Sequence, residues 1–146
     1  MSSSAPRPIP PPIVGVLETV LYVDDLERAA AFYREVMGLP ILYSDPRIRT
    51  FDVGGRGTLL LFPRGGTLSP VPTPGGTIPP HDGSGPVHIA FSIEAAALDD
   101  WRRHLAAADV AIESTTRWPR GGTSIYFRDP DGHLVEIATP GLWRGY

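Results

Sequence analysis

The chain has 146 residues, a formal net charge of −3 and no cysteine. Its composition, 42% hydrophobic and 20% charged, is typical of one globular domain with a single core. Without cysteine there are no disulfides and no thiolate sites, so any metal must bind oxygen and imidazole ligands. The acidic charge gives no reason to expect a nucleic-acid partner, and no apolar run approaches the roughly 20 residues that span a bilayer. Since no basic segment precedes an apolar one at the N-terminus, we expect a cytoplasmic protein.

Two segments are rich in proline, glycine or serine. Residues 1–12 (MSSSAPRPIPPP) have the composition of a disordered arm, and residues 64–85 have that of a linker. Regular patterns occupy about 13–63 and 86–140, and a short tail follows at 141–146. We therefore expect a single domain, 13–140, built from two modules.

The first module opens with an apolar stretch at 14–23 that predicts a strand. Asp24 is placed to cap the helix that follows, with Glu27 three residues on, as in a capping box. Apolar residues then recur at helical spacing as far as Gly38, a typical helix stop. Three short strand patterns come next, at 41–43, 49–53 and 58–62. The predicted order is β-α-β-β-β.

The second module repeats this order. A strand pattern at 87–93 precedes a helix pattern at 95–108, whose large apolar residues lie on one face. Further strand patterns follow at 111–115, 123–127 and 133–138. Because the two modules match in order, the sequence predicts an α+β fold in which two βαβββ modules form paired mixed sheets.

Laying one module over the other brings polar residues to matching positions. Glu18 in the first strand corresponds to His88 in the first strand of the second module. In the last strands, Leu60 corresponds to Glu136. A pseudo-two-fold pair of sheets would bring these four positions together. Three of the four bear potential metal ligands, and the fourth is apolar.

His88 and Glu136 are flanked by apolar residues within their strands, where a buried charge is costly unless it is paired or bound to metal. Taken singly, either side chain, like Glu18, could face solvent, and His88 could be a hydrogen-bonded core histidine. Taken together, the three favour a metal site. A Glu-His-Glu set suits Mn²⁺, Fe²⁺, Co²⁺, Ni²⁺ or Zn²⁺ and does not choose among them.

Three segments of the chain resemble the vicinal oxygen chelate superfamily. They are 17–26 (LETVLYVDDL) continuing to 31–33 (AFY), 85–91 (GPVHIAF) and 126–136 (YFRDPDGHLVE). The resemblance covers nearly all of the chain from 13 to 140 and implies a fold of paired βαβββ modules. This superfamily includes glyoxalases, extradiol dioxygenases, epimerases, fosfomycin-resistance enzymes and metal-free bleomycin-binding proteins.

The chain departs from two of these enzyme patterns. Extradiol dioxygenases generally bind ferrous iron with two histidines and one glutamate, whereas Glu18 stands at the first position here. A further histidine of their signature is replaced by the segment 117–120 (RWPR). Glyoxalases generally fill four ligand positions, and Leu60 leaves one without a ligand. Tyr126 matches a tyrosine that dioxygenases place near substrate, and it could equally pack at the edge of the core.

The resemblance implies a divalent-metal-dependent enzyme of glyoxalase or dioxygenase type, a lyase, isomerase or dioxygenase acting on a small substrate with adjacent oxygens. Glu18, His88 and Glu136 would hold one metal, and Glu18, Glu136 and Tyr126 are the candidate catalytic residues. In many relatives of this size each site is shared between two chains, which predicts a homodimer with Glu18 from one chain beside His88 and Glu136 of the other. The alternative is a metal-free protein that sequesters a ligand, against which the acidic positions argue.

Other polar residues have weaker claims to a role. His81 and Asp82 in the linker suit either a lid or a solvated loop. We expect His133, beside a turn, to be exposed. The segment 117–120 could line a cleft for an anionic or aromatic substrate, or lie on the plain surface.

Overall fold

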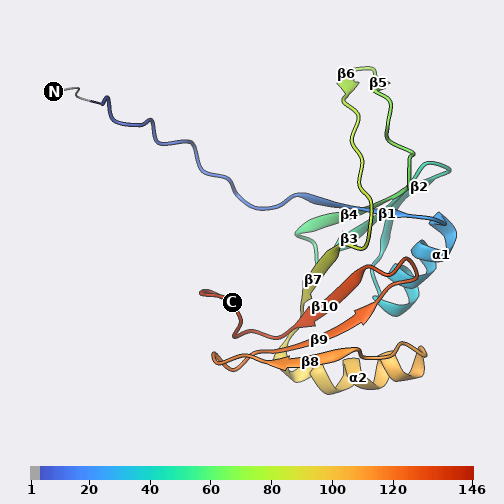
Figure 1. Ribbon diagram of the computed structural model, residues 1–146, viewed down its shortest axis with the longest axis vertical. Coiled ribbons are helices and arrows are strands. Elements are labelled where there is room, and N and C mark those ends of the chain that lie inside the picture. Colours follow the sequence, from blue (N-terminus) through green and yellow to red (C-terminus); the bar gives the residue numbers. More distant parts are fainter. Residues whose placement is uncertain (1–3) are drawn as a thin grey trace.

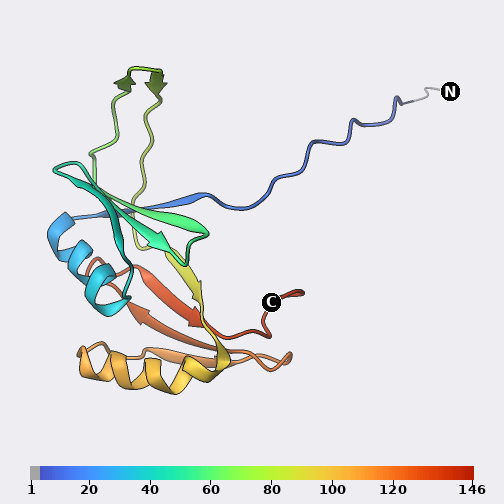
Figure 2. The same ribbon diagram turned by 180° about the vertical axis from the view of Figure 1, so that it is seen from behind.

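The computed structural model describes residues 4–146 and contains two modules, one above the other in Figure 1. Each module is a four-stranded sheet with one helix, seen from the opposite side in Figure 2. The first comprises β1 (Glu18–Val23), α1 (Leu26–Ala31), β2 (Ile41–Asp45), β3 (Ile48–Val53) and β4 (Gly57–Pro63). The second comprises β7 (His88–Ser92), α2 (Leu98–Ala107), β8 (Ser114–Arg117), β9 (Thr123–Arg128) and β10 (Leu134–Ala138). The predicted α+β fold of two βαβββ modules is confirmed.

The two sheets have the same topology, with strand orders β1-β4-β3-β2 and β7-β10-β9-β8. In each, the first and last strands of the module are parallel neighbours. Glu18 lies opposite Thr58, and His88 lies opposite Leu134. Leu60 lies two residues after Thr58, and Glu136 lies two residues after Leu134. The registers therefore agree with the correspondence expected from the sequence.

The first helix begins one residue later than expected. Its N-terminal cap is Asp25, whose carboxylate accepts a hydrogen bond from the backbone N–H of Arg28 at 3.1 Å. The predicted cap at Asp24 was wrong, because that carboxylate accepts instead from Arg64 Nε at 2.8 Å. Two adjacent aspartates offer equivalent local caps, so a tertiary ion pair decides between them. The last part of the helix widens into a π-helical turn at Phe32–Val36.

Three further elements begin three or more residues later than expected. The first strand begins at Glu18 rather than at 14. Just before it, the Leu17 carbonyl oxygen still accepts a hydrogen bond from the backbone N–H of Thr58 at 2.9 Å, whereas the start of the described chain extends away from both modules (Figure 1). The strand expected at 111–115 is β8, three residues later. The helix at 95–108 opens with a 3-10 turn at Ala95–Ala97. None of the described helices is long and apolar enough to cross a membrane.

One core lies between the two modules. Alternate residues of the inner strands point into it. The largest of the fully buried apolar side chains are Tyr33, Phe51, Phe127, Leu21, Leu59, Leu61, Leu105, Ile125 and Ile137. The rings of Phe32 and Phe127 have centroids 6.4 Å apart, so the first helix packs on the second sheet. Because strand side chains alternate between faces, the residues between the core positions form the opposite face of each sheet. Glu18, His88 and Glu136 all belong to that second face.

The segment between the modules, expected to be a linker, contains a small hairpin of β5 (Val71–Thr73) and β6 (Gly76–Ile78) that projects from the first module. The base of this hairpin is tied to β1. The Tyr22 hydroxyl is hydrogen-bonded to Thr67 Oγ1 at 2.9 Å and to His81 Nδ1. His81 is exposed but is held at the base of the hairpin by this hydrogen bond.

Candidate metal centre

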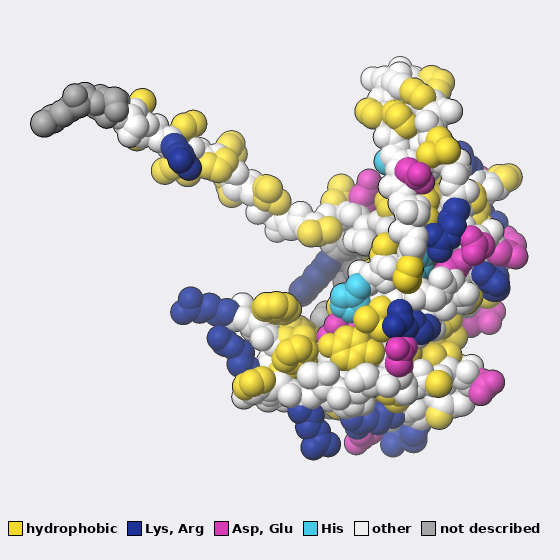
Figure 3. Space-filling view, in the orientation of Figure 1, with side chains coloured by type: hydrophobic (Ala, Val, Ile, Leu, Met, Phe, Trp, Pro, Cys, Tyr) yellow, Lys and Arg dark blue, Asp and Glu magenta, His cyan; other side chains and the backbone are white. Residues whose placement is uncertain are grey.

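His88 and Glu136 lie side by side because their strands, β7 and β10, are parallel neighbours. His88 Nε2 is 3.1 Å from Glu136 Oε1. The histidine side chain is 49% exposed and that of the glutamate 7% exposed, so the pair is buried on one side and open on the other. On the face seen in Figure 3 the surface is hollowed between the modules.

The protons of this pair can be placed from its neighbours. His88 Nδ1 lies 2.9 Å from the backbone carbonyl oxygen of Leu134, which can only accept. Nδ1 must therefore bear the hydrogen, and Nε2 of a neutral ring presents its lone pair. The atom it faces, Glu136 Oε1, also accepts. Two acceptors this close need either a shared proton, bound to Nε2 or to the carboxyl group, or a metal ion between them.

The spacing of these two atoms fits a metal. Two ligands at about 2.1 Å from one ion are about 3.0 Å apart at a right angle and about 3.4 Å apart at the tetrahedral angle. The observed separation of 3.1 Å falls within that range. The Nδ1–H bond to Leu134 also holds the ring in place, as a carbonyl group hydrogen-bonded to the other ring nitrogen commonly does for metal-binding histidines. His88 and Glu136 can thus serve as two ligands of one ion.

The second oxygen of Glu136 is already engaged. Ser124 Oγ donates to Glu136 Oε2 at 2.5 Å, and Trp118 Nε1 donates to Ser124 Oγ at 2.8 Å. Ser124 was not predicted from the sequence, since a lone serine in a strand matches no ligand pattern. Trp118 was expected only as part of a cleft or of the surface. The one signal available was spacing, because Ser124 lies two residues before Tyr126 and so shares its face of the sheet.

Tyr126 lies beside the pair. It stands directly opposite Glu136 in the β9–β10 register, and its ring centroid is 6.4 Å from that of His88. The side chain is partly exposed. A hydroxyl in this position can meet a molecule that approaches the open side of His88.

Glu18 does not complete a cluster within one chain. It is exposed, and it lies in β1 of the other module. Among residues 4–146, no three His, Asp or Glu side chains converge closely enough to hold a metal ion. One chain therefore brings together two of the three predicted ligands and leaves the third apart.

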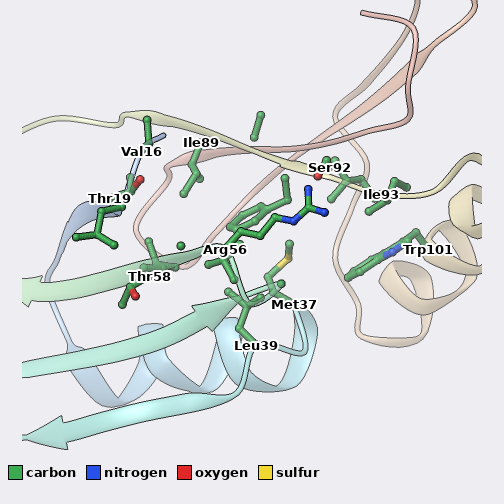
Figure 4. Close-up of a pocket in the computed structure, with 18 residues that line it drawn as sticks. Val16, Thr19, Met37, Leu39, Arg56, Thr58, Ile89, Ser92, Ile93 and Trp101 are labelled. Atoms are coloured by element: carbon green, nitrogen blue, oxygen red, sulfur yellow. The ribbon is translucent and has the colours of Figure 1, made fainter. Parts of the chain in front are cut away.

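A cavity of about 590 Å³ lies between the modules but is separate from this pair. Its lining includes Leu59, Ile89 and Phe91, which belong to the core or pack against it and thus lie on the face opposite His88. Arg56 extends through the cavity towards Ser92 (Figure 4). None of Glu18, His88, Glu136 and Tyr126 lines it.

Comparisons with known proteins agree with the fold and with the placement of the strands. The chain is 32% identical over 128 residues to the metallothiol transferase FosB of Shouchella clausii, covering 86% of this chain and 80% of that protein. It is 34% identical over 119 residues to FosB of Lysinibacillus sphaericus, covering 80% and 76%. The crystal structure of lactoylglutathione lyase from Agrobacterium tumefaciens superposes with a TM-score of 0.82 at 36% identity, covering 91% of this chain and 98% of that one.

The match extends to a whole family. Residues 15–137 match the Glyoxalase/Bleomycin resistance protein/Dioxygenase superfamily, and they include both modules and all four positions of the overlay. The resemblance seen in the sequence is thereby confirmed. The chain belongs to the Glyoxalase/Bleomycin resistance protein/Dioxygenase superfamily.

Proposed function

We propose that the protein is a divalent-metal-dependent enzyme acting on a small organic molecule with two adjacent oxygens. The observation that supports this most directly is the facing of two acceptors, His88 Nε2 and Glu136 Oε1, at 3.1 Å. The proposed ligands are Glu18, His88 and Glu136. A metal-free sequestering protein is not favoured. Binding in an apolar cleft does not require a histidine lone pair and a glutamate carboxylate that face each other.

We also propose that each site is shared between two chains. β1 and β7 are edge strands of their sheets, so each has one side without a neighbouring strand in the described chain. Exposed apolar residues precede both edges, with Leu17 75% and Val87 40% exposed. A two-fold assembly that sets β1 of one chain near β7 of the other would bring Glu18 to the His88–Glu136 pair twice. Such a homodimer accounts for the separation of Glu18 from its expected partners within one chain.

Each residue of the proposed site has a distinct part. The divalent ion would act as a Lewis acid toward the oxygens of the substrate. His88 keeps its Nδ1–H on Leu134 and so presents only Nε2. Glu18, the exposed carboxylate, would hold a proton exchanged with the substrate. The Tyr126 hydroxyl would donate a hydrogen bond to an oxygen of the bound molecule.

The class of reaction is proposed from the relatives and from the ligands together. The relatives compared above are named as a transferase and a lyase. Extradiol dioxygenases generally have histidine where Glu18 stands. We therefore place lyase, isomerase or group-transfer chemistry ahead of ring-cleaving dioxygenase chemistry.

Metal binding by the purified protein tests the proposal. Equilibrium dialysis against Mn²⁺, Fe²⁺, Co²⁺, Ni²⁺ and Zn²⁺ in turn should give about one ion per chain for at least one metal. His88→Ala and Glu136→Gln should each lose most of it, whereas His104→Ala, a control on the exposed face of α2, should not. A wild-type protein that binds none of the five metals, or variants that keep full binding, would overturn the proposal in favour of the metal-free alternative.

A further inference from the structure

The buried neighbours of Glu136 form a chain of hydrogen bonds whose direction is fixed by chemistry. An indole N–H can only donate, so the hydrogen of Trp118 Nε1 points to Ser124 Oγ, 2.8 Å away. The single hydrogen of the Ser124 hydroxyl is then free for Glu136 Oε2, 2.5 Å away. Ser124 is fully buried, and Glu136 is 5% exposed. The Ser124 hydroxyl thus accepts one hydrogen bond, from Trp118, and donates one, to Glu136.

This chain of hydrogen bonds gives the two carboxylate oxygens of Glu136 different partners. Oε2 is held by the serine, while Oε1 faces His88 Nε2. Turning the carboxylate so that both oxygens face the histidine would break the bond to Ser124 in a place where water has no access. A buried polar group left without a partner is costly, so the carboxylate should keep its orientation.

From this geometry we propose that Ser124 and Trp118 are positioning residues that make Glu136 a one-oxygen ligand, bound to the metal through Oε1 alone. The inference rests on the function proposed above and deepens it. Glu136 is thereby the fixed ligand of the site.

A merely structural role for the serine makes a different prediction. If Ser124 only satisfied a buried carboxylate, its loss would lower the stability of the fold and leave the bound metal unchanged. If it orients Glu136, its loss lets the carboxylate rotate, and both the affinity for the ion and the symmetry of the ligand field around it change. The spectrum of bound Mn²⁺ therefore distinguishes the two roles.

The test compares Mn²⁺ binding and Mn²⁺ electron paramagnetic resonance in the wild type, Ser124→Ala and Ser124→Thr. The matched control is Ser114→Ala, since Ser114 lies opposite Tyr126 on the same sheet and is exposed. We expect Ser124→Ala to bind Mn²⁺ about 10- to 100-fold more weakly, as is typical for loss of an outer-shell partner, with an altered zero-field splitting. Ser124→Thr, which keeps the hydroxyl, should recover most of the affinity, and Ser114→Ala should match the wild type.

Trp118→Phe provides a second, milder perturbation if a substitution at the fully buried Ser124 prevents folding, as judged by circular dichroism. It removes the indole donor, leaves the serine in place, and should weaken Mn²⁺ binding several-fold in the same direction. Unchanged affinity and spectrum in a folded Ser124→Ala or Trp118→Phe protein would overturn the positioning role while leaving the proposed metal site standing. A wild-type protein that binds neither Mn²⁺ nor any other divalent ion would overturn both the positioning role and the proposed metal site.

Discussion

His133, in the turn before β10, donates from Nε2 to the backbone carbonyl oxygen of Tyr22 in β1, 2.7 Å away. The other ring nitrogen, Nδ1, accepts from the backbone N–H of Val87 at 3.0 Å. The imidazole is 1% exposed, so the expectation of a solvated histidine was wrong. The ring joins the end of the first strand of one module to the residue before the first strand of the other. The two modules are therefore held together by a neutral histidine with both nitrogens satisfied.

Replacing His133 by alanine should destabilise the protein by about 2 to 4 kcal/mol, because a carbonyl and an N–H lose their buried partner together with the packing of the ring. Urea unfolding followed by circular dichroism measures this loss. His104→Ala is the matched control, since the His104 side chain also bonds a backbone carbonyl, that of Val36, but at an exposed place. Equal stability of the two variants would contradict a linking role for His133.

A second buried bond between the modules predicts a pH dependence. The Tyr33 hydroxyl donates to Asp129 Oδ2 at 2.7 Å. Burial raises the pKa of Tyr33 far above its ordinary value of 10.0, and the neighbouring Asp129 raises it further. The folded state thus keeps the proton at a pH where the unfolded chain loses it. The stability that this provides is complete below about pH 10 and falls as the pH rises above it, by up to about 1.4 kcal/mol per pH unit.

Tyr33→Phe isolates this contribution. At pH 8 the variant should be less stable than the wild type by about 1 to 3 kcal/mol, because Asp129 loses a donor. The difference should shrink between pH 10 and pH 11.5, since phenylalanine has no proton to lose. Urea unfolding of both proteins across this range measures the gap, and a gap that stays constant with pH would contradict the assignment.

The shared site predicts complementation between two inactive variants. Glu18→Ala and His88→Ala, unfolded and refolded together, should form mixed dimers in which one site collects both lesions and the other collects none. With random pairing, half of the dimers are mixed and each has one intact site, so roughly a quarter of the wild-type tight metal binding should return. The control is the same mixture of separately refolded proteins. If the ligands come from one chain, no site is restored and the mixture stays at the level of the controls.

Leu60 stands at the one position of the overlay that has no metal-binding side chain, which predicts the effect of adding a carboxylate there. Leu60 lies two residues beyond the Glu18–Thr58 pair, as Glu136 lies two beyond the His88–Leu134 pair. Leu60→Glu should tighten metal binding at least several-fold and suppress turnover, because a fourth ligand occupies a place meant for substrate. Leu60→Gln, similar in size but neutral, is the control for shape. Unchanged affinity and rate in Leu60→Glu would place Leu60 away from the site.

The sequence by itself determined the order of the elements and the correspondence between the modules. Strand side chains alternate with a period of two, so a short apolar strand with one polar residue indicates which positions share a face. That is why the match of Leu60 with Glu136 could be predicted and agrees with the observed registers. The family was also predictable from the sequence, because each segment that resembles it is continuous along the chain.

Only the tertiary structure decided which polar groups meet across the fold. Local sequence treats Asp24 and Asp25 alike, and the choice of cap depends on Arg64, forty residues away. The partners of Glu136 are similar, because Ser124 and Trp118 come from another strand and from the loop before it. His133 follows a turn, where exposure is the common outcome, and its burial depends on β1 lying above it. Hydrogen bonds between distant segments have no period along the chain, so their partners are set by how the sheets pack.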